Sequence, residues 1–268
     1  MMTTGSSDLP AQIAFSGGRT SGMMLALLKE EGAIENARVV FCNTGREMPQ
    51  TLDFVRNVGS HFNIPIDWVE YTPEKPWFKI VTHQSAARHG EPFEALIKKR
   101  KYLPNQQARF CTSELKIKPA KRFLKSLKWK RWANVVGIRA DEAHRAKQPK
   151  NEPWHNVFPL IEKQITRHDV VNFWRQQPFD LTLPSVDGKT PMGNCDGCFL
   201  KSERFIAALA RDMPERADWW ERMERETGGT WSKRYTREAT RQFVDAQGDW
   251  IFDDASALCQ ADGGECVF

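Results

Sequence analysis

No stretch of about 18 consecutive apolar residues occurs in the 268-residue chain, so a transmembrane helix is not expected. The first residues contain no basic segment followed by an apolar one, and they therefore do not resemble a secretory signal. We also find no internal repeat. With 40% hydrophobic and 27% charged residues, the composition is that of an ordinary globular protein. We expect a cytoplasmic protein that does not bind membranes.

Charge of either sign is not in large excess. The formal net charge of +5 is compatible with an anionic ligand, such as a nucleotide or a nucleic acid, without requiring one. Basic residues recur at helical spacing over residues 116–131, and a second basic run covers residues 98–101. These two segments can line a track for phosphates, with Trp129 and Trp132 available for stacking, or they can be solvated helix faces.

Short apolar runs alternate with helical patterns over the first two thirds of the chain. Strands are expected at residues 12–15, 38–42, 66–69 and 133–138. Helices are expected around residues 23–28, 50–61, 118–128 and 166–176, the last with Thr166 as its N-cap. This alternation predicts an α/β fold, with a doubly wound, mostly parallel sheet of Rossmann type and helices on both faces.

Two regions lack this alternation. Residues 72–105 are irregular and are expected to form a loop and short helices over the site. Residues 181–198 read as a loop, followed by helices at 202–211 and 214–226 and by a weakly patterned tail. We therefore predict a nucleotide-binding α/β domain over residues 1–180 and a C-terminal helical, cysteine-bearing region over residues 181–268.

A glycine-containing segment, residues 16–21, separates the first expected strand from the first helix. Its glycines let the backbone approach an anion, and the helix N-terminus that follows favours phosphate. It is neither a Walker loop nor a Gly-x-Gly-x-x-Gly motif, and the plainer interpretation is a turn that needs glycine. The hydroxyl groups and one arginine favour phosphate binding. The candidate residues are Ser16, Gly17, Gly18, Arg19, Thr20 and Ser21.

This loop resembles the Ser-Gly-Gly-x-Asp-Ser pyrophosphatase loop of the adenine nucleotide α-hydrolase superfamily, with Thr20 in place of the aspartate. Residues 43–45, Asn-Thr-Gly, resemble the Asp-Thr-Gly of the phosphoadenosine phosphosulfate (PAPS) reductase family. Residues 137–145 are similar to that family's Gly-x-Arg-x-x-Glu-x-x-Arg segment, and residues 158–174 to its Pro-Leu…Asp-Val-Trp stretch. Because the four segments occur in the family's order, the chain is identified as a member of the PAPS reductase family.

The resemblance extends the candidate site. It implies an adenine nucleotide ligand, either ATP or a sulfonucleotide (PAPS or its precursor APS). Additional nucleotide-binding candidates are Asn43, Thr44, Gly45 and Gly137. The catalytic candidates are Arg139, Arg145 and Glu142. Two arginines can clamp sulfate or phosphate while neighbouring acids hold them in place, although a surface ion-pair cluster would have the same sequence.

The chain has six cysteines: Cys42, Cys111, Cys195, Cys198, Cys259 and Cys266. In a reducing compartment, metal binding or catalysis is a better expectation than disulfides. Cys195 and Cys198 form a C-x₂-C pair that can hold a metal, and a four-cysteine set would suit zinc or a [4Fe–4S] cluster.

The segments around Cys111 and around the C-x₂-C pair resemble a bacterial and phage-type branch of the family, whose relatives carry a [4Fe–4S] cluster beside the nucleotide. The resemblance implies a cluster on Cys111, Cys195, Cys198 and Cys266, with Cys259 as the alternative fourth ligand. The family's Glu-Cys-Gly-x-His tail is replaced here by Glu-Cys-Val-Phe. Cys266 can therefore be a nucleophile or a ligand, but not both at once.

Three functions remain open at this stage. The leading one is an enzyme acting at the α-phosphate or the sulfo group of an adenine nucleotide, with the cluster supplying electrons or sulfur. The second is ATP-dependent sulfur transfer to tRNA or DNA. The third is a zinc-stabilised nucleotide-binding module without turnover. An electron or sulfur donor protein and a homo-oligomeric assembly are expected partners.

Overall fold

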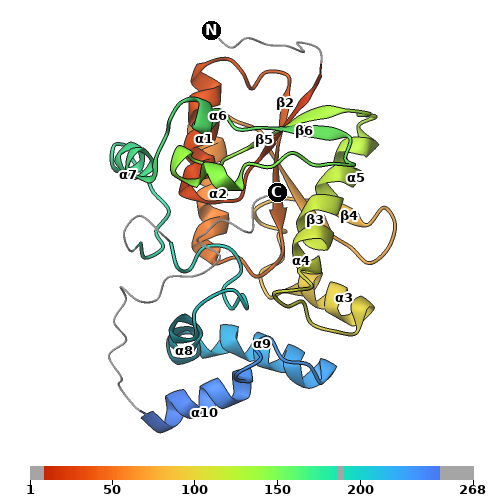
Figure 1. Ribbon diagram of the computed structural model, residues 1–268, viewed down its shortest axis with the longest axis vertical. Helices are drawn as coiled ribbons and strands as arrows, with labels where there is room; N and C mark the ends of the chain where they lie inside the picture. Colours follow the sequence, from red (N-terminus) through yellow and green to blue (C-terminus); the bar gives the residue numbers. More distant parts are fainter. Residues whose placement is uncertain (1–8, 186–189, 248–268) are drawn as a thin grey trace.

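The structure is a computed structural model that describes residues 9–185 and 190–247 of the chain. Its centre is a six-stranded sheet with the order β4-β3-β2-β1-β5-β6 (Figure 1). All neighbouring strands are parallel except β3 and β4. The strands are β1 (Ala11–Ala14), β2 (Ala37–Asn43), β3 (Ile66–Tyr71), β4 (Phe78–Val81), β5 (Trp132–Val136) and β6 (Trp154–Val157). The predicted α/β fold with a doubly wound, mostly parallel sheet is confirmed.

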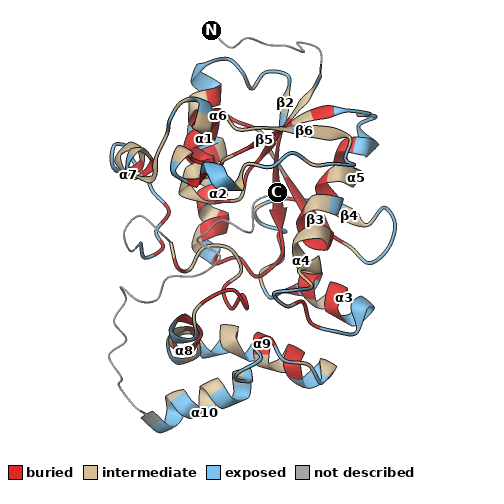
Figure 2. Ribbon diagram, in the orientation of Figure 1, coloured by how far each residue is buried: buried red, intermediate tan, exposed pale blue. Residues whose placement is uncertain are grey.

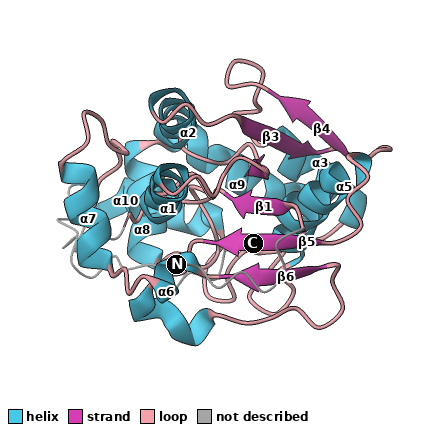
Figure 3. Cartoon of the chain, turned by 90° about the horizontal axis from the view of Figure 1, so that it is seen from above, coloured by secondary structure: helices cyan, strands magenta, loops and turns pink. Residues whose placement is uncertain are grey.

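Helices cover both faces of this sheet, as the view in Figure 3 shows. The α-helices of the α/β unit are α1 (Arg19–Glu30), α2 (Pro49–His61), α3 (Glu91–Arg100), α4 (Phe110–Thr112), α5 (Lys118–Ser126), α6 (Pro159–Glu162) and α7 (Arg167–Arg175). A π-helix (Ser113–Ile117) joins α4 to α5, and a 3₁₀-helix covers Ala140–Arg145. The predicted N-cap of α7 is confirmed, because Thr166 and Asp169 form a capping box.

Successive side chains of β2 point to opposite faces of the sheet, and both faces are covered by hydrophobic residues. Val39 and Phe41 point into a large hydrophobic cluster with residues of α1, α2 and α7. Val40 and Cys42 point to the opposite face, into a cluster that includes Phe123 of α5. A strand buried on both faces reads as an unbroken apolar run, which is why its sequence favoured a parallel sheet.

Successive strands are added to the sheet first on one side of β1 and then, from β5 onward, on the other side, so the order of the strands reverses there. From β1 the chain proceeds outward through β2 to β3, and it later returns to form β5 on the other side of β1. In open α/β sheets, ligands bind at the carboxyl ends of the strands at such a reversal. The loops that follow β1 and β5 therefore border the expected crevice.

A second layer of helices packs against one end of the α/β unit (Figure 1). It consists of α8 (Glu203–Asp212), α9 (Pro214–Thr227) and α10 (Arg237–Gln247). Phe93 of α3 shares a hydrophobic cluster with Trp219, Trp220 and Trp231, so this layer and the α/β unit have a common core. The exposed and half-buried residues of α10 leave it at the periphery (Figure 2).

Several elements differ from the sequence-based expectation. The interval expected as loop and short helices contains the antiparallel edge strand β4 as well as α3, and β6 and α10 were not predicted. Both strands are four residues long and partly exposed, and a strand of that length shows too little alternation to be recognised. Among the described residues, no helix is long and apolar enough to cross a membrane.

An ion pair joins α3 to α9. Glu94 Oε2 lies 2.7 Å from Arg222 Nη2, and hydrogen bonds from Arg222 together with Lys98 hold the pKa of Glu94 at about 2. A carboxylate whose pKa is lowered in the folded state stabilises that state above its unfolded pKa of about 4.3. This contribution is lost as the pH falls through the folded value.

We therefore expect Glu94→Gln to lower the free energy of unfolding by about 1 kcal/mol at neutral pH. The difference from the wild type should shrink between about pH 4.3 and pH 2. Urea denaturation at a series of pH values measures both quantities. Glu226→Gln is the matched control, because Glu226 contacts the same arginine but its side chain is 40% exposed. A pH-independent difference for Glu94→Gln would contradict the assignment.

Candidate functional site

The loop of residues 16–21 leaves β1 at the carboxyl edge of the sheet. The Ser21 hydroxyl accepts a hydrogen bond from Ser16 N at 3.3 Å and donates one to Gly18 O at 3.1 Å. Gly17 has a φ of +78°, and a Cβ at this position would lie 2.8 Å from Thr51 Cγ2. Glycine is therefore required at position 17 by both backbone conformation and packing.

Helix α1 begins at this loop without a capping side chain. The N-cap residue is Gly18, which has no side chain to accept a hydrogen bond from the first turn, and the first turn contains no acidic residue. The N–H groups of the first turn thus retain their capacity to donate, and no side chain neutralises the positive end of the helix dipole. This is the arrangement in which helix N-termini bind phosphate.

Arg19 does not point at this loop. Its Nε donates to Asp180 Oδ1 at 2.7 Å, and its Nη1 donates to Thr190 Oγ1 at 2.9 Å. It also donates to the carbonyl oxygen of Leu181. In this structure Arg19, a predicted phosphate ligand, therefore holds the segment that follows α7.

The turn after β2 is buried and internally bonded. Asn43 donates to Glu70 Oε1 at 2.6 Å and to Ala87 O at 2.8 Å, and it accepts from Gly45 N at 3.2 Å. Thr44 donates to Glu47 from both its backbone and its hydroxyl group, each at 2.9 Å. With 0% and 1% exposure, Asn43 and Thr44 are buried, and these hydrogen bonds fix the turn at the carboxyl end of β2.

The loop after β5 lies against the loop after β1. A Cβ at Gly137 would lie 3.3 Å from the Cα of Ser21, so the two backbones approach closely at this point. Arg139 Nη1 donates to Thr20 Oγ1 at 3.3 Å. The two loops on either side of the chain reversal are therefore in direct contact, and Arg139 links them.

Glu142 connects the two arginines of this segment. Its carboxylate lies 2.8 Å from Arg139 and 2.9 Å from Arg145, and all three side chains are 10–12% exposed. Asp141 adds a second acid, 2.9 Å from Arg139. Burial of Asp141 raises its pKa, but the hydrogen bond and charge of Arg139 outweigh this and hold the pKa below its usual value. The arginines are thus fixed by acids, as the sequence suggested.

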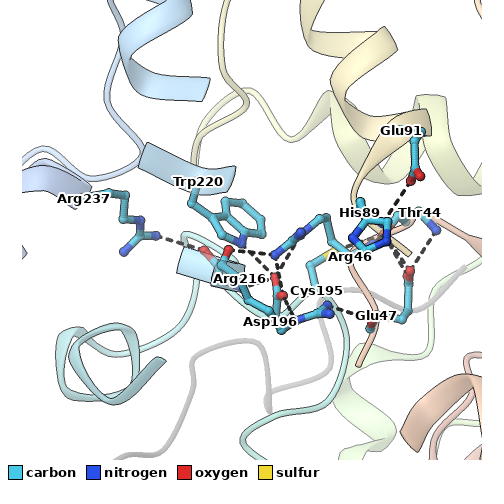
Figure 4. Close-up of polar contacts among 11 residues, drawn as sticks. Thr44, Arg46, Glu47, His89, Glu91, Cys195, Asp196, Arg216, Trp220 and Arg237 are labelled. Atoms are coloured by element: carbon cyan, nitrogen blue, oxygen red, sulfur yellow. Dashed lines mark hydrogen bonds and ion pairs between the residues drawn. The ribbon is translucent and has the colours of Figure 1, made fainter. Parts of the chain in front are cut away.

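The C-x₂-C segment docks on the turn between β2 and α2 (Figure 4). Cys195 pairs with Glu47 in an isolated antiparallel bridge, and Asp196 N donates to Arg46 O at 2.9 Å. This pairing places Cys195 Sγ 3.4 Å from Thr44 Oγ1. A cysteine late in the chain therefore contacts the loop that leaves the second strand.

A buried carboxylate fixes this docking. Asp196 is 0% exposed, and its Oδ2 lies 2.6 Å from Arg46 Nη2 and 2.5 Å from Arg216 Nε. Its Oδ1 accepts from Trp220 Nε1 at 2.7 Å and from Gly197 N at 2.8 Å. Both carboxylate oxygens are thus engaged, by the neighbouring Gly197 N, by one residue of the α/β unit and by two of α9 (Figure 4).

Three cysteines border one hydrophobic cluster. Cys198 is a buried member of the cluster around Trp220, and Cys111 and Cys195 pack against it. Burial raises the pKa of Cys195 well above its usual range, and the charge of Glu47 adds to this effect. Near neutral pH this thiol stays protonated unless a metal displaces the proton.

The described residues contain no group of three or more Cys, His, Asp or Glu side chains close enough to hold a metal ion. Cys266 and Cys259 lie outside the described residues. The donor chemistry nevertheless fits an iron–sulfur cluster. Cys111, Cys195 and Cys198 are soft thiol ligands, and they border an apolar cluster that limits access of water.

Comparison with known protein families shows to which family the chain belongs. The model of the phosphoadenosine phosphosulfate reductase domain matches residues 10–181. The chain belongs to this family. The match covers the crevice loops after β1, β2 and β5, and it ends before the C-x₂-C segment.

Two relatives are similar over most of this PAPS reductase family chain. An uncharacterized nin region protein of Escherichia phage lambda is 32% identical over 211 residues, which are 75% of this chain and 69% of the phage protein. An uncharacterized protein of Methanocaldococcus jannaschii is 30% identical over 228 residues, which are 81% of this chain and 42% of the archaeal protein. The phage relative agrees with the predicted phage-type branch.

Two solved structures are also similar. The phosphate complex of PAPS reductase from Candida auris has a TM-score of 0.45 and 17% identity, covering 67% of this chain and 81% of that protein. The U34-tRNA thiolase NcsA from Methanococcus maripaludis, solved with its [4Fe–4S] cluster, has a TM-score of 0.40 and 16% identity. That match covers 97% of this chain and 81% of the thiolase.

Sequence reasoning missed the residues that hold the cysteine segment in place. Arg46 and Glu47 directly follow the Asn-Thr-Gly turn, and Asp196 lies between the two cysteines. Their closeness in sequence to predicted site residues could have identified them. No feature of the sequence identifies Arg216 and Trp220, because they lie on a separate helix and contact Asp196 only through tertiary packing.

We expect Asp196→Asn to lower the free energy of unfolding by about 3–5 kcal/mol, since it leaves two partly or fully buried guanidinium groups without their carboxylate. Urea denaturation measures this change. Asp218→Asn removes the 57%-exposed partner of Arg241 and should cost less than about 1 kcal/mol. Equal effects of the two substitutions would show that Asp196 contributes no more than a surface ion pair.

Proposed function

We propose that this chain is a sulfur-metabolism enzyme of PAPS reductase type, acting on a sulfonucleotide or ATP with a [4Fe–4S] cluster beside the nucleotide. The observation that supports this most directly is the contact between Cys195 Sγ and Thr44 Oγ1, 3.4 Å apart. Thr44 leaves β2 at the same edge of the sheet as the glycine loop leaves β1. A cysteine-bound group and a nucleotide would therefore share one edge.

The nucleotide would bind across the chain reversal between β1 and β5. The N–H groups of the glycine loop and of the first turn of α1 would hold phosphate, and Gly137 lets the loop after β5 pack directly against Ser21 beside them. Arg139 and Arg145 would stabilise negative charge that develops on the phosphate or sulfo group. Glu142 would keep both guanidinium groups in position, since it contacts each of them.

The cluster ligands would be Cys111, Cys195, Cys198 and Cys266, with Cys259 as the alternative to Cys266. When bound by all four cysteines, the cluster would supply electrons to the substrate; with three cysteine ligands, it would carry a sulfur atom at the open iron. The surrounding tryptophans, Trp219, Trp220 and Trp231, would exclude water from the thiol ligands. We further propose a cytoplasmic location, a separate electron or sulfur donor protein and a homo-oligomeric state.

The cluster is tested by anaerobic purification followed by iron, sulfide and zinc analysis and an absorption spectrum. We expect about four irons and four sulfides per chain, because a Cys₄ set suits a [4Fe–4S] cluster. Cys195→Ser should lose most of the iron. Cys42→Ala is the control, because Cys42 is buried beneath α5 and should keep the iron content unchanged. One zinc and no iron would refute the cluster.

The nucleotide site is tested by calorimetric titration with ATP, APS and PAPS. We expect Arg139→Gln to weaken binding by about tenfold or more, the order of one charged hydrogen bond. Arg19→Gln should change affinity much less, because its guanidinium is held by Asp180. Urea midpoints of both variants separate lost affinity from lost folding. A larger loss in Arg19→Gln would place the phosphate elsewhere.

A further inference from the structure

A buried carboxylate at the carboxyl end of β3 has no role in the function proposed above. Glu70 is 0% exposed, and it lies directly opposite Asn43 in the parallel pairing of β2 and β3. Burial of an ionised carboxylate is costly unless hydrogen bonds and a cation compensate for the lost water. The contacts of Glu70 therefore indicate what this residue does.

These contacts join three parts of the chain. Glu70 Oε1 accepts hydrogen bonds from Asn43 Nδ2 at 2.6 Å and from the backbone N of Ala87 at 2.7 Å. The other carboxylate oxygen, Oε2, lies 3.0 Å from Nζ of Lys79 on β4, and that lysine side chain is 50% exposed. Glu70 thus connects the end of β2, the edge strand β4 and the segment that follows β4.

The amide of Asn43 is used entirely within the protein. Its two amide hydrogens are directed at Glu70 Oε1 and at Ala87 O, the latter at 2.8 Å, and its Oδ1 accepts from Gly45 N at 3.2 Å. An asparagine amide has only two donor hydrogens, so neither is left for a nucleotide. Together, Asn43 and Glu70 satisfy both backbone groups of Ala87.

This hydrogen-bond pattern requires an amide at position 43, where the family motif that residues 43–45 resemble has aspartate. An aspartate would place carboxylate oxygens against Glu70 Oε1 and Ala87 O. A carbonyl oxygen and an ionised carboxylate both accept hydrogen bonds and cannot donate them, and two carboxylates at such a distance repel each other. In this chain the acid therefore lies on β3 and the matching amide on β2.

Two packing contacts extend this geometry into the candidate site. Gly45 has a φ of +80°, and a Cβ there would lie 3.1 Å from the backbone N of Gly90, so the turn after β2 packs closely on the segment after β4. Within the same turn, Thr44 Oγ1 lies 3.4 Å from Cys195 Sγ. The position of the turn therefore determines where the C-x₂-C segment docks.

We propose that Glu70 is a positioning residue of the candidate site. By accepting hydrogen bonds from Asn43 and Ala87, it holds the turn after β2 where Thr44 contacts Cys195, and Asn43 is the amide that matches it. The inference rests on the proposed function only for what the cysteine segment binds. The position of the turn itself can be measured without metal or nucleotide.

The test measures amide hydrogen exchange on the full chain, purified anaerobically, and the iron that the chain retains against a chelator. Glu70→Ala should speed exchange of the Gly45 and Ala87 amides by about tenfold or more, the effect of one net hydrogen bond. Retained iron should fall by about half or more, because the contact behind Cys195 is loosened. Glu70→Gln should stay near the wild type in both, since its amide oxygen can accept the same two bonds.

Asn43→Asp separates this role from packing, because aspartate and asparagine have nearly the same shape. It should speed exchange and lower retained iron as Glu70→Ala does. Combining Asn43→Asp with Glu70→Gln should recover about half of each loss, because the glutamine amide can donate to the new carboxylate. This pair of variants also decides the question if Glu70→Ala does not fold.

Asp67→Asn is the matched control. Asp67 lies nearer the amino end of β3, and Arg38 donates to it at 2.6 and 2.8 Å. It should leave exchange at Gly45 and Ala87 and the retained iron near wild-type values. Unchanged exchange in Glu70→Ala, a loss in Glu70→Gln as large as in Glu70→Ala, or no recovery in the double variant would each overturn the proposal. A wild-type chain without iron would refute the cluster, while the exchange rates would still decide the role of Glu70.

Discussion

The rest of the site depends on the burial of one carboxylate. Asp196 lies between Arg46 from the turn after β2 and Arg216 from α9, and desolvation of these charges is offset only when all three are together. The ion pairs therefore couple formation of the C-x₂-C segment to docking of the helical layer. A chain in which α9 is displaced would also lose the contact between Cys195 and Thr44.

The two halves of the site have opposite physical character. The proposed phosphate side is formed mainly by backbone N–H groups and by arginines that acids already hold, so an anion would meet donors fixed before it arrives. The thiol side is apolar and aromatic, and burial there keeps Cys195 protonated. Thr44 and Glu47 form the boundary between these halves, because they contact the cysteine segment from the polar edge of the sheet.

The elements that the sequence predicted are those with local causes. The glycine loop, the capping box at Thr166 and the double-sided apolar run of β2 each depend on residues within a few positions of one another. The engagement of Arg19 with Asp180 and of Asp196 with Arg46 spans 161 and 150 positions, and no local pattern encodes such pairings. The same limit applies to β4 and β6, whose pairing with longer strands defines them.

The π-helix of Ser113–Ile117 has a consequence for the direction in which Cys111 points. A π turn contains one residue more than an α turn, so everything before it is rotated by about 100° relative to a regular helix continuing back from α5. Helix α5 is fixed against the sheet by Phe123 and Leu124. The orientation of this thiol is thus set by an inserted residue rather than by sheet packing. A lineage could redirect the sulfur by gaining or losing a single codon there, while the hydrophobic face of the helix stayed where it is.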